Sequence, residues 1–288
     1  MTNTAIIAGL IAAAAAAAFG AGQPEGKAGK RAAFGLIAEP AGAPPGGEFL
    51  LGLTWKLEPG WHTYWQGLND SGMPAAWELT LPDGWTADEA MWPAPTRHVL
   101  PGDIVDHIYE DVVTVVVPVR VAQRAKAGDR VEIKAGARWM VCSESCVLES
   151  GDARVTVTVG GEGVKPEDRP ARARKIPGAS RIPEPLLADA GIGVSITNDT
   201  LVFEGRKDVT ALAYFPAEDA TPPADMVDGC EARGATLRVA LRASEGKKPL
   251  GKGVLRVDRG AERAWYVIDT TDKSPAPADR VLRKDDSR

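Results

Sequence analysis

Turn-forming residues recur along this chain at short intervals, and they limit how long any helix or strand can be. The 288 residues include 31 glycines and 22 prolines. Typical clusters are Pro59-Gly60, Asn69-Asp70-Ser71-Gly72, Pro82-Asp83-Gly84 and Ala127-Gly128-Asp129. Such residues interrupt helices and suit the tight turns that join strands. Their spacing therefore favours many short strands over a helical bundle.

The apolar segments between these turns are strand candidates. They cover 48–55, 76–79, 112–121, 130–135 and 154–159 in the first half, and 193–196, 200–203, 209–215, 236–241, 253–257 and 264–268 in the second. Short alternating or apolar runs at regular spacing are typical of antiparallel sandwiches. We therefore predict an all-β chain of two immunoglobulin-like β-sandwich domains joined by a Pro/Gly-rich linker.

Composition divides the chain into five regions. An uncharged, Ala-rich run followed by small residues predicts a signal peptide over 1–22, with a retained membrane anchor as the alternative. We expect the first sandwich over 32–160, the linker over 161–185 and the second β-rich domain over 186–270. The polar segment 271–288 contains two prolines, and we expect it to be disordered. The protein is then exported, and soluble after the signal is cleaved.

The distribution of charge argues against a nucleic-acid partner. The chain has a formal net charge of −5, and residues 31–160 hold 10 Lys and Arg against 17 Asp and Glu. Binding to phosphates needs clustered Lys and Arg, and the sequence has no such cluster. We expect no nucleic acid among the partners.

Cys142 and Cys146 are the strongest chemical feature of the sequence. The spacer between them, Ser143-Glu144-Ser145, suits a turn that brings two cysteines within disulfide reach. A loop this small gains little stability from a cross-link, which favours a reactive pair over a structural staple. We expect the third cysteine, Cys230, to be a spare thiol, with pairing across the domains as the alternative.

A reactive pair of this kind would work by thiol–disulfide exchange, in which a thiolate attacks a disulfide and the neighbouring cysteine resolves the product. Two alternatives remain open. One is a binding or assembly sandwich with a structural Cys142–Cys146 bridge, and the other is a Cu(I)-handling module built from Met140, Cys142 and Cys146. We predict no cofactor and no zinc site, because ligand spacing is lacking among the three histidines, His62, His98 and His107.

Four distinctive segments, three of which contain tryptophan, follow one another in the first half. They are Trp61-His62-Thr63-Tyr64-Trp65, Asn69-Asp70-Ser71-Gly72-Met73-Pro74, Trp92-Pro93-Ala94-Pro95 and Trp139-Met140-Val141-Cys142-Ser143-Glu144-Ser145-Cys146. Over 45–160 the chain resembles the N-terminal periplasmic region of the DsbD-like protein-disulfide reductases, especially the copper-sensitivity (ScsB-type) branch. The second half resembles the second exported segment of that branch more loosely.

The resemblance implies a periplasmic immunoglobulin-like module that passes electrons through Cys142 and Cys146. Its partners would be a membrane-embedded electron donor of the DsbD type and thioredoxin-like exported proteins. Cys146 would be the sulfur that meets the incoming partner. The membrane and thioredoxin-like domains of the family have no counterpart in these residues, so we expect either a donor on a separate polypeptide or a role that the fused proteins lack.

The resemblance also implies a loop that caps the cysteine pair and opens when a partner docks. We place this cap at 100–109, where Asp103 and Asp106 would shuttle protons near the thiols. Family caps lay an aromatic ring over the sulfurs, whereas this segment has only one ring, that of His107, before its final tyrosine. The expected cap residues are Asp103, Ile104, Val105, Asp106, His107 and Tyr109.

Overall fold

The fold was analysed on a computed structural model that describes residues 31–242 and 248–271. Strands dominate these residues, and helix is limited to α1 (Arg169–Ala173) and two 3-10 turns at Pro166–Asp168 and Ala188–Ala190. The all-β prediction is confirmed. None of the helices in the described ranges has the length and apolar character needed to cross a membrane. The predicted signal peptide (1–22) and all but the first residue of the predicted tail (271–288) lie outside the described residues.

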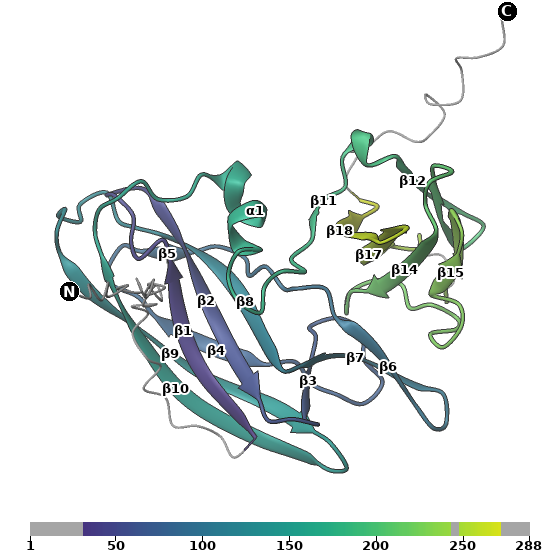
Figure 1. Ribbon diagram of the computed structural model, residues 1–288, viewed down its shortest axis with the longest axis horizontal. Helices are drawn as coiled ribbons and strands as arrows, with labels where there is room; N and C mark the ends of the chain where they lie inside the picture. Colours follow the sequence, from purple (N-terminus) through teal and green to yellow (C-terminus); the bar gives the residue numbers. More distant parts are fainter. Residues whose placement is uncertain (1–30, 243–247, 272–288) are drawn as a thin grey trace, which may run out of the picture.

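Two sheets face each other in the first part of the chain (Figure 1). The first sheet has the order β1–β2–β8–β5: β1 (Ala32–Glu39), β2 (Glu48–Leu57), β8 (Val112–Arg120) and β5 (Thr86–Ala87). The second has the order β10–β9–β3–β7–β6, and β4 also pairs with β9: β10 (Cys146–Thr158), β9 (Arg130–Cys142), β3 (His62–Tyr64), β7 (Ile104–Glu110), β6 (Thr96–Leu100) and β4 (Ala76–Thr80). The pairs within both sheets are antiparallel.

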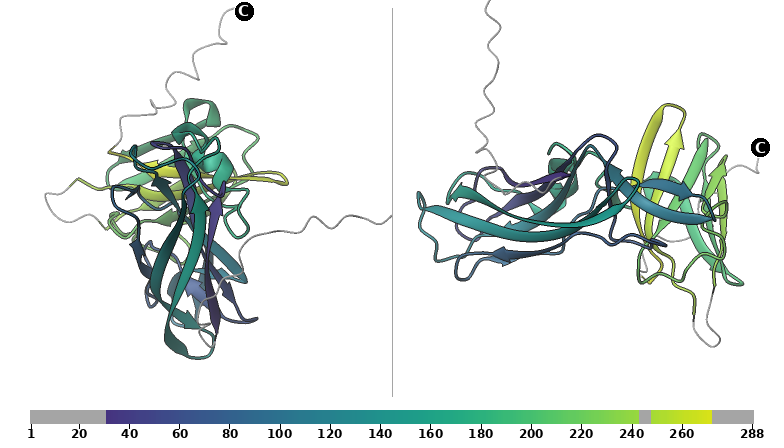
Figure 2. Two further views of the ribbon diagram at one scale, coloured as in Figure 1. Left: turned by 90° about the vertical axis from the view of Figure 1, so that its left-hand side faces the viewer. Right: turned by 90° about the horizontal axis from the view of Figure 1, so that it is seen from below.

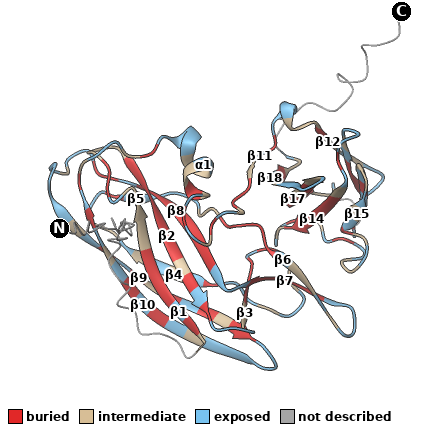
Figure 3. Cartoon of the chain, in the orientation of Figure 1, coloured by how far each residue is buried: buried red, intermediate tan, exposed pale blue. Residues whose placement is uncertain are grey.

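Aromatic side chains fill the space between these sheets. Phe34 of β1 lies 5.0 Å from the ring of Trp55 and 5.7 Å from the ring of Trp139, between ring centroids. Trp55 and Trp139 come from opposite sheets and meet edge to face at 6.2 Å. Burial of such large apolar surfaces is the main driving force for packing the two sheets. Figure 3 shows the resulting buried stripe along β2, β8 and β9.

Strands of the second part form two further sheets. One has the order β11–β18–β17–β14–β15: β11 (Glu184–Pro185), β18 (Glu262–Asp269), β17 (Lys252–Arg259), β14 (Ala211–Pro216) and β15 (Glu231–Arg233). The other has the order β12–β13–β16: β12 (Ile192–Thr197), β13 (Thr200–Gly205) and β16 (Thr236–Ala240). Their shared core includes Phe203 and Tyr214, whose ring centroids are 5.4 Å apart.

The segment 161–185, predicted to be a linker without a core of its own, is packed against the first sheet. Ala173, Ile176 and Ile182 are buried in a cluster with Leu50 of β2 and Val116 of β8. These apolar residues show no regular spacing in the sequence, because the segment contains only one short α-helix and no strand of the first sheet. Periodicity therefore does not reveal that they are buried. The segment still connects the two groups of strands, but it is not a free spacer.

The two groups of strands lie side by side (Figure 2), and Ala213 and Phe215 of β14 belong to the core cluster of the first group. Phe215 of β14 is buried, and its ring centroid lies 5.5 Å from His107 and 6.4 Å from Trp65. The Leu68 amide donates to the carbonyl of Pro216 at 2.9 Å. The second group of strands therefore packs against the face of β7 that carries His107. The opposite face of β7 contributes to the site described next.

Candidate functional site

The two predicted cysteines sit opposite each other at the end of the hairpin made by β9 and β10. Cys142 is the last residue of β9, Cys146 is the first of β10, and the two are register partners. Their Cα atoms are 4.1 Å apart and their sulfurs form a disulfide. The Ser143 amide donates to the Ser145 carbonyl and closes the turn. The structure thus contains the pairing across a short turn that the spacing predicted.

The two sulfurs differ in environment. Cys142 is 3% exposed and packs in a small cluster with Tyr64 and Ile108, against which Met140 also lies. Cys146 is exposed at the hairpin end, which is the pale blue tip of β9 and β10 in Figure 3. An incoming thiolate must approach along the S–S axis with free access to one sulfur. Cys146 is an exposed residue and Cys142 is buried, so Cys146 is better placed to meet an incoming thiolate.

Tyr64 provides the aromatic ring at the disulfide. Strand β3 lies beside β9 with His62 opposite Cys142, and Tyr64 points to the same face two residues later. The Tyr64 hydroxyl lies 3.8 Å from Cys146 Sγ, and it must be the donor because a disulfide sulfur carries no proton. Burial, with a smaller contribution from the charge of Asp106, raises the pKa of Tyr64 to about 12. The hydroxyl therefore keeps its proton near neutral pH.

The loop that follows β3 holds the Tyr64 ring in place. The backbone of Gly72 packs directly against the ring, so closely that a Cβ at this position would lie 1.8 Å from a ring carbon. The buried carboxylate of Asp106 accepts hydrogen bonds from the Ser71 amide, the Ser71 hydroxyl and the Gly72 amide. Asp106 on β7 thus fixes the turn that presses Gly72 against Tyr64. The segment 69–74 therefore acts on the cysteine pair indirectly, by holding the Tyr64 ring beside the disulfide.

The segment predicted to be a cap loop, 100–109, is a β-hairpin instead. Strands β6 and β7 pair through it, and only 101–103 form the turn. Its alternation is hard to detect in the sequence, because polar Asp106 and His107 occupy fully buried strand positions. The structure thus shows paired strands over this segment, and its opening when a partner docks stays a prediction.

The expected cap residues occupy several different environments. Asp103 is in the exposed turn with a φ of 59°, and Ile104 is 37% exposed. Val105, Asp106, His107 and Tyr109 are buried. The Tyr109 hydroxyl donates to the Pro93 carbonyl, and neither expected proton shuttle, Asp103 or Asp106, bonds to a sulfur among the described contacts. The β7 residue in the buried cluster with Tyr64 and Cys142 is Ile108, which the sequence did not single out.

His62 and His98 are adjacent in space although they are far apart in the sequence. Their ring centroids are 5.3 Å apart, and His62 also meets Tyr64 edge to face at 5.4 Å. Burial, and then the proximity of His98, lowers the pKa of His62. Within 31–242 and 248–271, no group of three or more His, Cys, Asp or Glu side chains is placed to hold a metal ion.

Two other groups are kept unreactive by burial. Burial lowers the pKa of His107 to about 4, and its Nδ1–H donates to the Leu68 carbonyl at 2.6 Å. Cys230 is 2% exposed, and burial raises the pKa of its thiol to about 12. A thiol of this kind is a poor nucleophile at neutral pH, in agreement with the prediction of a spare cysteine.

Comparison with known proteins supports the resemblance seen in the sequence. Residues 36–157 match the family model described as "Thiol:disulfide interchange protein DsbD, N-terminal". The N-terminal periplasmic domain of ScsB from Proteus mirabilis has a similar fold, with a TM-score of 0.51 and 14% identity over 84% of this chain and 94% of that one. The E. coli chaperone DraB matches with 11% identity over 82% of this chain and 98% of that one, but at a TM-score of 0.20 the likeness supports no conclusion. No curated protein sequence matches the chain.

Proposed function

Because residues 36–157 match the DsbD N-terminal family, we propose that this chain is an exported thiol:disulfide interchange module that relays electrons through Cys142 and Cys146. A membrane-embedded donor of the DsbD type would reduce the pair, and the pair would reduce thioredoxin-like exported proteins in the periplasm. The observation that carries the proposal is the asymmetry of the disulfide. One sulfur is open to a partner and the other is buried beside it, ready to leave and later to resolve.

Reduction of the pair follows two exchange steps. A donor thiolate attacks Cys146 Sγ, the Cys142–Cys146 bond breaks, and Cys142 leaves as a thiolate that takes up a proton. The second donor thiolate then attacks the donor sulfur of the mixed disulfide and releases Cys146. The donor ends as a disulfide, and Cys142 and Cys146 have gained two electrons and two protons. Delivery to a target disulfide runs the same steps in reverse, with Cys146 attacking and Cys142 resolving.

The neighbouring side chains favour attack at one sulfur. The Tyr64 hydroxyl, which retains its proton, can donate to the Cys146 thiolate when Cys146 is released in the second step and when it later attacks a target. Cys142 is buried in a cluster with Tyr64 and Ile108, whereas Cys146 is exposed, which favours Cys146 as the sulfur that a partner attacks. Glu144 in the turn opposes thiolate formation, which suits a relay driven by its donor more than a strong oxidant.

The test is the reduction potential of the pair, measured by equilibration with dithiol buffers, together with the fold of the Cys142→Ser/Cys146→Ser double variant. A relay predicts a potential within the range of exchange proteins, above about −300 mV, and a double variant that keeps its fold. A potential below that value, with loss of folding in the double variant, would identify a structural staple and reject the proposal.

Cu(I) binding is a second candidate, because the thioether-bearing Met140 packs against the cluster that contains Cys142. Two thiolates and a thioether are soft ligands of the kind that Cu(I) selects. Anaerobic titration of the reduced protein with Cu(I) decides this candidate. One equivalent bound tightly, and lost in Met140→Leu, supports it, whereas the absence of stoichiometric binding removes it.

A further inference from the structure

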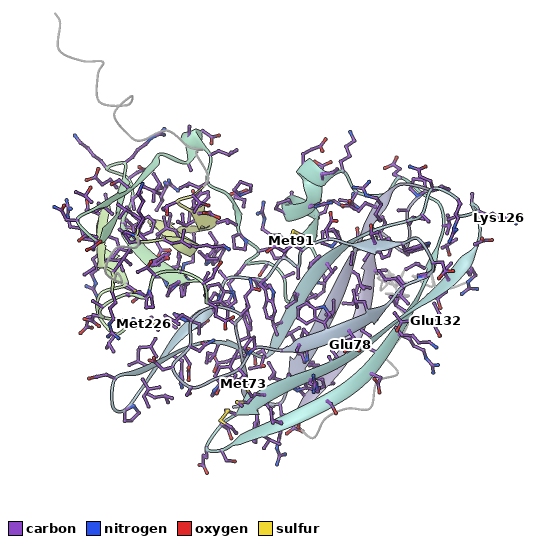
Figure 4. The ribbon with its side chains drawn as sticks, turned by 180° about the vertical axis from the view of Figure 1, so that it is seen from behind. Met73, Glu78, Met91, Lys126, Glu132 and Met226 are labelled. Atoms are coloured by element: carbon purple, nitrogen blue, oxygen red, sulfur yellow. A yellow bond between two sulfur atoms is a disulfide. The ribbon has the colours of Figure 1, made fainter. Side chains whose placement is uncertain are left out.

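The outward face of the β9–β10 hairpin has exposed apolar side chains next to the disulfide. Leu148 of β10 is 68% exposed and Met73 is 50% exposed. Both line one surface groove with Met140, and Arg138 lines the same groove farther along β9. We call this surface the methionine groove and define it by Met73, Arg138, Met140 and Leu148. Figure 4 shows Met73 beside the sulfur atoms at the hairpin end.

The methionine groove is continuous with the sulfurs because of strand periodicity. Met140 precedes Cys142 by two residues and Leu148 follows Cys146 by two, so both side chains point to the face that holds the disulfide. Leu148 and Met140 are register partners, which makes them neighbours across the hairpin. At about 3.3 Å per residue, this pair begins roughly 7 Å from the disulfide.

Single exposed apolar residues are common on protein surfaces, but a cluster beside a reacting atom is not explained by chance exposure. A partner that forms a mixed disulfide with Cys146 has its own sulfur bonded at this spot. The residues that flank the partner's cysteine must then lie within one or two residue lengths of Cys146. The methionine groove is an apolar surface within that reach.

We propose that the methionine groove is the docking surface for a protein partner whose reactive cysteine is flanked by exposed apolar residues. This inference rests on the proposed exchange function and adds to it the chemistry that selects the partner. Unbranched methionine side chains can adapt to more than one partner, as a relay between a donor and several targets requires. Arg138 at the far end of the groove suits a neutral or acidic side chain in the bound segment.

The experiment compares two reductants that act on the same disulfide. Reduced thioredoxin is the protein probe, and dithiothreitol is the probe that is too small to use the groove. The variant Leu148→Ser removes the most exposed apolar side chain of the groove without touching a cysteine. Leu187→Ser is the matched control, since Leu187 is 61% exposed in the segment between β11 and β12.

We expect Leu148→Ser to slow reduction by thioredoxin about tenfold, a loss equivalent to about 1.4 kcal/mol, and to leave reduction by dithiothreitol unchanged. Leu187→Ser should match the parent protein with both probes. The inference is overturned if Leu148→Ser reacts with thioredoxin at the parent rate, if both probes slow equally, or if thioredoxin has no advantage over dithiothreitol in the parent protein. A parent protein that neither probe reduces would instead overturn the proposed function and this inference with it.

Discussion

Removing the Tyr64 hydroxyl should raise the pKa of the Cys146 thiol. In the oxidised protein this hydroxyl lies 3.8 Å from Cys146 Sγ and keeps its proton, because burial raises the pKa of Tyr64 to about 12. After reduction it can donate to the Cys146 thiolate but gives less to the neutral thiol. Tyr64→Phe removes this donor while it keeps the ring that packs against Cys142.

The size of the effect follows from the strength of a hydrogen bond to a charged group. Such bonds contribute about 1.5–3 kcal/mol, and one pKa unit corresponds to about 1.4 kcal/mol. The contact to sulfur is long, so we take the lower bound and expect the thiol pKa to rise by about one unit in Tyr64→Phe. At pH values below the thiol pKa, the thiolate fraction and the rate of alkylation at Cys146 should fall about tenfold.

The assay is the pH dependence of alkylation at Cys146 in the reduced protein, followed by mass spectrometry of the modified peptide. Tyr109→Phe is the matched control, because its hydroxyl donates to the Pro93 carbonyl on the other face of the sheet. That variant should lose stability but keep the parent thiol pKa. The reasoning fails if Tyr64→Phe and the parent protein titrate together, or if Tyr109→Phe shifts the thiol pKa as much.

Three further predictions concern the support of Tyr64 and the packing behind β7. Gly72→Ala should displace the Tyr64 ring, since its Cβ would lie 1.8 Å from a ring carbon; chemical denaturation should show a loss of about 1–3 kcal/mol, and a parent-like stability would contradict this. Asp106→Asn should weaken the three hydrogen bonds that hold the turn at Ser71 and cost about 1–3 kcal/mol, whereas Asp103→Asn in the exposed turn should be neutral. Acid should destabilise the fold through His107: its pKa is about 4 when folded and near 6.5 when unfolded, so only the unfolded state binds the proton between these values. Stability should therefore be lost as pH falls from about 6.5 to 4, by up to about 3 kcal/mol, and a His107→Gln variant with the same pH dependence would refute the assignment.

Much of the fold could be predicted from the sequence, because short apolar runs between Gly- and Pro-rich turns identify strands directly. The runs at 48–55 and 112–121 correspond to β2 and β8, and those at 200–203 and 253–257 to β13 and β17. Strand β7 was missed, since its two polar residues at buried positions conceal the alternation of a strand. Their burial depends on partners from other segments, and neither spacing nor composition reports such contacts.

The candidate site could likewise be predicted only in part. The Cys142–Cys146 pairing could be predicted because it is local, with a turn of three residues between the sulfurs. The contact of Tyr64 with Cys146 and the cluster of Tyr64, Ile108 and Cys142 join strands separated by long stretches of chain. Strand order decides which side chains reach the sulfurs, and that order became visible only in the folded chain. The resemblance identified the segments around the site but not the role of each residue.

The central claim is that a partner meets the disulfide at Cys146. The most direct test treats the oxidised protein with a thioredoxin variant that lacks its resolving cysteine, so that the mixed disulfide persists. Peptide mapping by mass spectrometry then identifies the residue that is linked. We predict a link to Cys146 with Cys142 left as a free thiol; a link to Cys142, or no adduct under conditions in which dithiothreitol reduces the pair, would contradict the account.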